Sequence, residues 1–420
     1  MPSHTAPVLP RPSAPASAPS RRRRRGPAVA AALAVLLAAG AAVPALTRRS
    51  APPPRLCAID AVQARALSGM AAFATWLRDN HAAGFVGEVG WPAGPDARSW
   101  AAVAELWYTA ADRMRLPVTA WAAANWPAAY PMAVFRATSS SGPLDRAGAQ
   151  AAVLARHQGP LRGVDAATGS FGTAAPGYDA GHPGVFPHAY GYENEDDYSY
   201  LADQGVSLVR LSVSWERLQP VPFHALDATE VQRVRDSVYA AQRHGLLVLL
   251  DLHGYGDFAA GGGRGTLRLG SPALPTGALA DFWRRAVTAL PPVYGYDLLN
   301  EPQHLAATGT AGARLWESAS RQAADAIRAA HGHGLLVVAG YGDAQPGAWG
   351  RLHPAPWISD PLDRVAYDAH AYFDSDGSGR YAASYPRELT LAQQAGGGPT
   401  RSCLPLSAFD ASDAQDRTQP

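Results

Sequence analysis

Short apolar runs alternate with longer amphipathic segments through most of this 420-residue chain. The short runs are bounded by glycine, proline and polar residues, which favours strands, whereas the longer segments repeat apolar residues at helical spacing. We predict strands near residues 85, 118, 161, 208, 246, 296, 335 and 365. We predict helices at residues 62–80, 99–114, 144–157, 194–204, 229–244, 279–289 and 311–330.

An alternation of eight strands with helices or helix-length connections is typical of an α/β fold, the closed (β/α)8 TIM barrel. A closed barrel accounts for all eight strands because it leaves no unpaired strand edge. The composition agrees with this prediction. With 47% hydrophobic residues and a formal net charge of +1, the chain can bury one large core, and its charge balance does not predict a nucleic-acid partner.

Residues 1–56 differ in composition from the predicted barrel, which we place at residues 57–405. Arg21 to Arg25 precede an almost wholly apolar segment, residues 27–46, and a proline-rich linker follows. This order predicts an export signal and a secreted protein. The apolar segment is also about as long as a membrane span, so an anchor to the outer face of the cell membrane stays open. Residues 406–420 are polar and predict a disordered tail.

Two glutamates are candidates for acid chemistry. The strand near residue 296 ends on Asn300-Glu301-Pro302, and a buried parallel strand of this kind delivers its last side chains to the open end of a barrel. Glu88 lies among small residues in the strand near residue 85. Two carboxylic acids can cleave a glycosidic bond if one protonates the leaving oxygen and the other attacks or activates water. For Glu88, an exposed carboxylate at a strand end is the simpler alternative.

Several predicted strands end in motifs of charged, amide and aromatic residues. These motifs are Arg162-Gly163-Val164-Asp165, Val209-Arg210-Leu211, Ser214-Trp215-Glu216-Arg217-Leu218-Gln219-Pro220, Asp251-Leu252-His253, Leu299-Asn300-Glu301-Pro302, Tyr367-Asp368-Ala369-His370-Ala371-Tyr372 and Asp374-Ser375-Asp376-Gly377-Ser378-Gly379. In this order they resemble the successive strand ends of glycoside hydrolase family 5. In that family the acid/base glutamate ends the fourth strand and the nucleophilic glutamate ends the seventh, with a tryptophan on the eighth.

The order of the motifs along the chain differs from the order in the family. The matching series stops after the family's sixth strand, and the remaining pieces stand at the front. Gly87-Glu88-Val89-Gly90 is similar to the nucleophile strand, and residues 121–126 resemble the eighth strand. The resemblance therefore implies a circularly permuted barrel, with strands 7 and 8 in residues 57–157 and strands 1 to 6 in residues 158–405. Permutation is physically reasonable because the ends of a barrel lie close together.

The resemblance implies a role for each matching side chain. Glu301 would be the acid/base and Glu88 the nucleophile of a retaining mechanism, about 5 Å apart. The other residues expected to bind the sugar or orient the two acids are Arg210, His253, Asn300, His370, Tyr372 and Trp121. A strand-end ion pair for Arg210, core packing for the histidines and barrel packing for Trp121 are the structural alternatives, and Trp126 is a competing stacking platform.

The function implied by the resemblance is a retaining endo-β-1,4-glucanase that acts on β-linked polysaccharides, as a monomer and without a cofactor. A β-mannanase, another β-glycosidase or a transglycosylase stays open, because loops set substrate choice in this fold. A carbohydrate-binding barrel without turnover is the alternative outside catalysis. Asp374 and Asp376 begin a stretch similar to a calcium loop, but no glutamate closes it at the required spacing, so no metal is expected.

The chain has two cysteines, Cys57 and Cys403, one near each end of the predicted barrel. In the unpermuted order Cys403 would precede Cys57 across the cut, so a disulfide between them would tie the new termini together. An even pair in an exported protein favours this bond. Two unrelated thiols are the alternative.

Overall fold

Eight parallel strands close into a barrel in the computed structural model, which describes residues 55–56, 59–139, 142–157, 159–396, 404–411 and 414–420. Each strand pairs with the next along the chain, and the last pairs with the first. This arrangement confirms the predicted TIM barrel. The barrel strands are β2 (Ala83–Gly90), β3 (Val118–Ala123), β6 (Arg162–Ala166), β7 (Leu208–Val213), β8 (Leu247–Leu252), β11 (Gly295–Asp297), β12 (Leu335–Ala339) and β13 (Val365–Tyr372).

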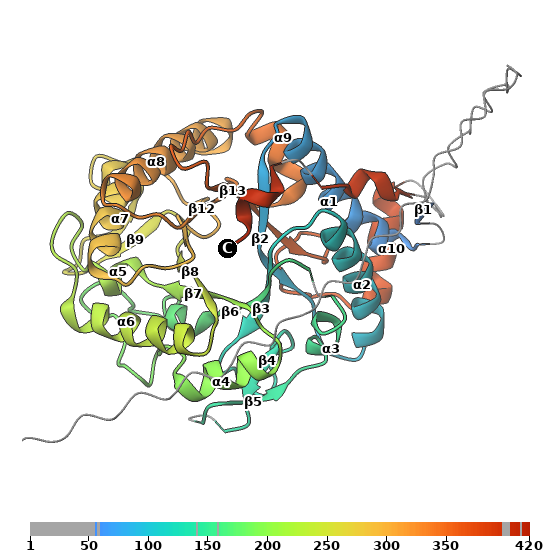
Figure 1. Cartoon of the computed structure of the whole chain (residues 1–420), viewed down its shortest axis with the longest axis horizontal. Coiled ribbons are helices and arrows are strands. Elements are labelled where there is room, and N and C mark those ends of the chain that lie inside the picture. The colour runs from blue at the N-terminus through green and yellow to red at the C-terminus, as the bar shows by residue number, and fades with distance from the viewer. Residues whose placement is uncertain (1–54, 57–58, 140–141, 158, 397–403, 412–413) are drawn as a thin grey trace, which may run out of the picture. The chain divides into compact units, whose positions relative to one another are not determined.

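Helices surround the barrel on its outside (Figure 1). Several begin with the side-chain caps that helix starts favour, as at Asp60, which accepts a hydrogen bond from the backbone of Gln63 in a capping box. The longer helices are α1 (Ala61–Asp79), α2 (Ala97–Arg113), α4 (Glu195–Asp203), α6 (Ala228–Arg243), α7 (Gly277–Ala289), α8 (Gly309–Ala329) and α10 (Tyr385–Gly396). The one-turn helices are α3 (Ala151–Leu154), α5 (Trp215–Leu218) and α9 (Trp349–Leu352), and the short 3-10 helices are η1 (Ala167–Ser170) and η2 (Pro346–Ala348).

Alternating side chains of each strand enter two different cores. On β7, Val209 and Leu211 belong to the large apolar cluster between the strands and the helices. Leu208 belongs to a second, smaller cluster together with residues such as Phe85 and Leu249 from other strands. Arg210 lies two residues beyond Leu208 on β7, so it faces the same way, toward the barrel interior. The barrel is therefore filled by apolar side chains at one level and by polar side chains at the next.

The C-terminal residues cover the end of the barrel at which the strands begin. The chain forms the 3-10 helices η3 (Leu406–Phe409) and η4 (Gln415–Thr418), and its C-terminus lies near the barrel axis in Figure 1. The amide of Gln415 donates to the carbonyl of Gly84 at 2.9 Å and accepts from its N–H at 3.0 Å. The sequence predicts a disordered tail at 406–420. The described part is ordered because Gln415 satisfies backbone groups at the start of β2.

One predicted helix is replaced by a hairpin. Where the sequence predicts a helix at 144–157, β4 (Phe135–Ala137) pairs with β5 (Leu144–Ala147), and only the short α3 follows. The Asp145 carboxylate accepts hydrogen bonds from the N–H and the hydroxyl of Thr138, both at 2.7 Å, which stabilises the turn between the two strands. Two further pairs lie outside the barrel: β9 (Asp257–Ala260) with β10 (Gly265–Arg268), and β1 (Arg55–Leu56) with β14 (Leu404–Pro405).

Residues 27–46, Cys57 and Cys403 lie outside the described ranges. The predicted export signal or membrane anchor and the predicted disulfide therefore stay predictions. Among the helices that the structure does describe, none has the length and apolar character needed to cross a membrane.

Candidate active site

An irregularity in β2 aims Glu88 at the mouth of the barrel. Phe85 and Glu88 lie opposite Asp368 and His370 of β13, so β2 contains one residue more than its neighbour over this stretch. The extra residue forms a β-bulge, which changes the direction of the side chains that follow it. Gly87 makes this possible, because a Cβ atom there would lie 2.4 Å from the Asp368 carboxylate. Its N–H instead donates to Asp368 Oδ1 at 2.5 Å.

Glu301 faces Glu88 from a connection rather than from a strand. β11 ends at Asp297, and Glu301 adopts a positive φ of 39° just before Pro302. A carboxylate oxygen of Glu88, one of Glu301 and a ring nitrogen of His370 all lie within 4.8 Å of one another. The Glu301 side chain keeps 16% of its surface exposed, whereas Glu88 keeps 5%. The two glutamates predicted to act together are thus close neighbours, and Glu301 is the more accessible of the two.

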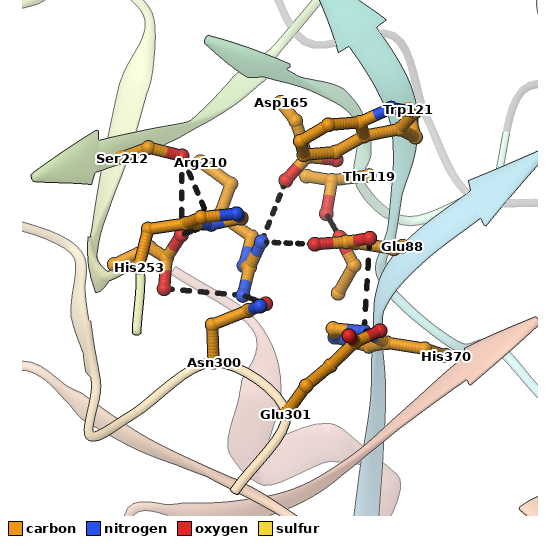
Figure 2. Close-up of polar contacts among 12 residues, drawn as sticks. Glu88, Thr119, Trp121, Asp165, Arg210, Ser212, His253, Asn300, Glu301 and His370 are labelled. Atoms are coloured by element: carbon orange, nitrogen blue, oxygen red, sulfur yellow. Dashed lines mark hydrogen bonds and ion pairs between the residues drawn. The ribbon is translucent and has the colours of Figure 1, made fainter. Parts of the chain in front are cut away.

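Arg210 is the centre of a buried network beneath these two acids (Figure 2). Its Nη1 atom donates to Glu88 Oε1 at 3.1 Å and to Asp165 Oδ1 at 2.8 Å. Its Nε atom donates to Asp297 Oδ2 at 2.8 Å, and its Nη2 atom donates to Asn300 Oδ1 at 2.7 Å. The fork of guanidinium donors thereby joins four strands or strand ends of the barrel.

The network contains more carboxylates than cations. Asp251 Oδ1 also lies 3.1 Å from Arg210 Nη2, so four carboxylates surround one guanidinium. Burial raises the pKa of Asp297 to about 7, although Arg210 acts to lower it. Burial likewise raises the pKa of Asp165 well above its usual value. Burial thus favours the neutral form of these two carboxyl groups, against the attraction of Arg210.

His370 connects the two glutamates electrostatically. Its Nδ1 atom lies 2.8 Å from Glu301 Oε1, and its Nε2 atom lies 3.1 Å from Asp368 Oδ2. Burial acts to lower the pKa of His370, but the negative charges of Glu88 and Asp368 outweigh it and raise the pKa well above the usual value. An imidazolium fits this position, because both of its N–H groups can then donate to carboxylates.

Tyr372 is the second hydrogen-bond donor to Glu88. Its hydroxyl donates to Glu88 Oε2 at 2.5 Å. Burial and then the charges of Glu88 and Glu301 raise the pKa of Tyr372 well above its usual value, so the phenol keeps its proton. Arg210 and Tyr372 thus hold the two oxygens of the Glu88 carboxylate separately.

Aromatic rings line another part of the site. Trp121 stacks on His253 with ring centroids 5.6 Å apart, and its indole N–H donates to the Tyr130 hydroxyl at 2.7 Å. His253 Nδ1 lies 2.7 Å from Asp251 Oδ2, so the Arg210 network also orients this imidazole. Trp126 lies next to Trp121, with centroids 6.1 Å apart. The predicted platform and its predicted competitor therefore form one aromatic surface.

All predicted site residues within the described ranges converge on this end of the barrel. They are Glu88, Trp121, Arg210, His253, Asn300, Glu301, His370 and Tyr372. The sequence pattern indicates no role for five further residues of the site, which are Thr119, Asp165, Asp251, Asp297 and Asp368. An acid inside an otherwise apolar strand is the signal that identifies the four aspartates, because such a group is buried only with partners.

The loop that resembles a calcium site uses its first carboxylate internally. Asp374 accepts hydrogen bonds from the N–H groups of Gly379 and Tyr381, at 3.2 and 3.1 Å, and from the Ser378 hydroxyl at 3.2 Å. This stretch is thus an ordered turn after β13, held by its own backbone.

Comparison with known proteins places this site in a family. The family described as Cellulase (glycosyl hydrolase family 5) matches residues 173–401. Similar proteins include the manganese dependent endoglucanase Eg5A of Phanerodontia chrysosporium, with 25% identity over 59% of this chain and 66% of the relative. Endo-beta-1,4-glucanase A of Emericella nidulans shares 26% identity over 53% of this chain and 65% of the relative. The chain thus covers just under two thirds of the length of each.

A solved structure of the endoglucanase Cel5A from Pseudomonas stutzeri is also similar. It shares 29% identity over 57% of this chain and 74% of its own, with a TM-score of 0.47. The family match at residues 173–401 extends over more than half of the 420 residues and includes Arg210, Glu301 and His370. The chain therefore belongs to glycosyl hydrolase family 5.

Proposed function

We propose that this protein is a retaining endo-β-1,4-glucanase in which Glu88 is the nucleophile and Glu301 the acid/base. The observation that carries the proposal is the separation of the two carboxylates, at most 4.8 Å between their nearer oxygens. Retaining enzymes hold their carboxyl groups about 5–5.5 Å apart, whereas inverting enzymes need about 6.5–9.5 Å to admit a water. The names of the similar proteins, which are endoglucanases, support the substrate class.

The contacts of each acid suit its proposed role. In the first step Glu301 donates its proton to the leaving glycosidic oxygen while Glu88 attacks the anomeric carbon, forming a glycosyl ester. In the second step the Glu301 carboxylate takes a proton from water, which displaces Glu88. Arg210 and Tyr372 donate hydrogen bonds to the two oxygens of Glu88 and so orient its carboxylate for attack. Glu301 retains solvent access, which the water of the second step requires.

Asn300 and Trp121 are the proposed contacts to the sugar. Arg210 can only donate, so the Asn300 oxygen must face it, and the Asn300 amide N–H groups point away. In this orientation Asn300 can donate to the sugar 2-hydroxyl at the cleaved bond. Trp121 offers a ring face beside His253 on which the sugar can stack.

Hydrolysis of defined polysaccharides tests the proposed activity. We expect the protein to cleave a soluble β-1,4-glucan internally, so that viscosity falls well before many reducing ends appear. Proton NMR should show the β-anomer as the first product, because two displacements restore the configuration. A β-1,4-mannan should be a poorer substrate. Preference for mannan, an α-anomer formed first, or no cleavage by the folded protein would each contradict the proposal.

We also propose that the barrel is circularly permuted relative to its family. The family match begins at residue 173, so β2, β3 and β6 precede it in the chain. Around the closed sheet, β2 lies three strands beyond β11, because β12 and β13 stand between them. That is the spacing between the family's fourth and seventh strands, which carry its acid/base and its nucleophile. The proposal therefore depends on Glu88 being the nucleophile, and the Glu88→Ala variant tests both.

A disulfide between Cys57 and Cys403 is proposed for the exported protein. Both cysteines lie outside the described residues, but β1 and β14 pair antiparallel with Arg55 opposite Pro405 and Leu56 opposite Leu404. The described neighbours Leu56 and Leu404 thus lie opposite each other, which supports the proposed pairing. Exchange with a disulfide donor in the export compartment would form the S–S bond and reduce the donor to two thiols.

Mass spectrometry checks this pairing. In the protein purified without reductant, we expect neither cysteine to be alkylated. We also expect one pair of linked peptides, which contains both cysteines, survives heating and is separated by a thiol reductant. After reduction, both cysteines should be alkylated. Two reactive thiols in the exported, folded protein would contradict the proposed disulfide.

A further inference from the structure

Arg217 is a buried cation whose guanidinium, among the described residues, donates its hydrogen bonds to one loop. It lies on α5, directly after the strand that carries Arg210, and keeps only 3% of its surface exposed. Its guanidinium donates to the carbonyl oxygens of Gly169, Phe171 and Pro183 at 2.8, 2.7 and 2.9 Å. In the part of the chain that the structure describes, Arg217 forms no ion pair with a carboxylate. Backbone carbonyls therefore offset the cost of burying its charge.

The loop in question, residues 167–194, connects β6 to α4, and we call it the β6–α4 loop. Besides the three carbonyls, Arg217 contacts two of its rings. The guanidinium carbon lies 3.7 Å from the ring centre of Tyr190 and 5.3 Å from that of Tyr178. The five contacts span the loop from Gly169 to Tyr190. One side chain thus ties together segments of a long connection that has only a short 3-10 helix of its own.

The same loop forms one wall of a cavity beside the candidate active site. The cavity has a volume of about 360 Å³. Thr173 and Tyr178 of the loop line one part of it, whereas His253, Tyr255 and Leu299 line another. Since His253 also stacks on Trp121, the cavity adjoins the proposed sugar site directly. Its volume lies within the range of about 300–1,000 Å³ that small-molecule sites occupy.

Glu216, the neighbour of Arg217, binds the same wall and also lines the cavity. Glu216 Oε2 accepts a hydrogen bond from the Tyr178 hydroxyl at 3.3 Å, and Glu216 Oε1 accepts from the N–H of Ala259 on β9 at 2.8 Å. The loop joins β9 directly as well, because the N–H of Ala180 donates to the carbonyl of Ala259 at 2.8 Å. The one-turn helix α5 therefore connects the Arg210 strand, the β6–α4 loop and the β9–β10 hairpin.

We propose that Arg217 is a positioning residue that holds the β6–α4 loop as a preformed wall of a sugar-binding cavity next to the catalytic pair. The proposal rests on the proposed glucanase function. Ordering a long loop costs conformational entropy, and a loop that is already ordered removes this cost from substrate binding. The catalytic groups themselves stand on β2, β7, β13 and the connection after β11, so loosening the loop should weaken binding more than it slows the chemical steps.

Kinetics of Arg217 variants test the proposal. For Arg217→Ala we expect KM for a soluble β-1,4-glucan to rise about tenfold, which equals about 1.4 kcal/mol of binding. We expect kcat to change by less than about twofold. For Arg217→Lys we expect KM to rise by an intermediate factor, because one ammonium cannot reach three separated carbonyls. Added methylguanidinium should lower KM for Arg217→Ala and leave KM for Arg217→Lys unchanged. An unchanged KM, or a loss confined to kcat, would overturn the assignment.

Arg233→Ala is the matched control. Arg233 contacts the same loop, with its guanidinium carbon 4.2 Å from the ring centre of Phe186 and its Nη1 2.8 Å from the Tyr190 hydroxyl, but it also pairs with Glu230 at 2.9 Å. It does not line the cavity, so its removal should leave KM near the wild-type value. An equal rise of KM in both variants would reduce Arg217 to a general loop contact and would contradict the proposal.

Limited proteolysis separates this proposal from the proposed function. Chymotrypsin should cleave folded Arg217→Ala within the β6–α4 loop, at Phe171 or Tyr178, faster than it cleaves the wild type, and a cello-oligosaccharide should slow this cleavage. Equal cleavage rates would overturn the anchoring role. If the wild type hydrolyses no glucan but shows the expected difference in cleavage, the glucanase proposal fails while the anchoring of the loop by Arg217 stands.

Discussion

Replacing Glu88 by alanine is expected to lower glucan hydrolysis by about 10⁴-fold or more, because the covalent step loses its nucleophile. Glu88 is 4% exposed, and Arg210 and Tyr372 donate to its carboxylate, so the attacking group is held in place within the site. Azide should restore activity toward an aryl β-glycoside with a good leaving group. The product should be the α-glycosyl azide, because a single displacement by the small anion inverts the configuration.

Glu301→Ala should differ from Glu88→Ala in the product that azide forms. With a good leaving group the glycosyl ester still forms on Glu88 and only its breakdown is slow. Azide should then give the β-glycosyl azide, because attack on the ester inverts the configuration a second time. Exchange of the two products between the variants would reverse the assigned roles. Full activity of Glu88→Ala would contradict both the nucleophile assignment and the permuted barrel.

Glu317→Gln is the matched control for both variants. Glu317 is a buried glutamate on α8 that contacts His353 at 3.0 Å, away from the catalytic pair. Its substitution should leave glucan hydrolysis and the azide products as in the wild type.

Replacing Arg210 by methionine is expected to lower the free energy of unfolding by about 3–5 kcal/mol, because it leaves buried carboxylates without their cation. Four carboxylates face this guanidinium, and Arg210, Asp165, Asp251 and Asp297 are all 0% exposed. Denaturant unfolding followed by circular dichroism measures the difference. Glucan hydrolysis should fall as well, since Glu88 and Asn300 both lose a donor.

The deficit of Arg210→Met should grow as the pH rises. The pKa of Asp297 is raised by burial to about 7 in the folded protein, above the value of about 3.9 for an unfolded chain. The folded state therefore binds more protons than the unfolded state. As the pH rises from about 4 to about 7, the contribution of Asp297 to the free energy of unfolding falls. Without the guanidinium, the folded pKa values of the carboxyl groups rise further. The free energy of unfolding of Arg210→Met then falls more steeply with pH than that of the wild type, and it continues to fall to higher pH.

Arg328→Met provides the comparison for this pH dependence. Arg328 binds one carboxylate, with its Nε and Nη2 atoms 2.7 and 2.9 Å from the two oxygens of Asp360. Arg328 and its neighbours act to lower the pKa of Asp360, against the effect of burial. Removing Arg328 should therefore cost stability above the ordinary carboxyl pKa without a growing deficit toward neutral pH. A deficit of Arg210→Met that stays constant or shrinks with pH would contradict the buried-charge account.

The amino-acid sequence by itself determined the local structure and the order of the acids. Apolar runs between glycines and polar residues predicted the barrel strands, and helical spacing predicted most of the surrounding helices, because both patterns report which face of an element is buried. Asn300-Glu301-Pro302 marked a strand end with a carboxylate. The prediction failed at 144–157, where the Thr138 contacts of Asp145 stabilise a hairpin turn that apolar spacing does not reveal.

Only the tertiary structure decided which polar side chains share one buried space. Arg210 meets Asp165 because β6 and β7 pair with these residues opposite each other, and it meets Glu88, 122 positions away, because the barrel closes between β13 and β2. The bulge at Gly87 and the cover that Gln415 forms over Gly84, 331 positions away, depend on the same closure. Register and closure are properties of all eight strands together, so the charge balance around Glu88 cannot be read from any one of them.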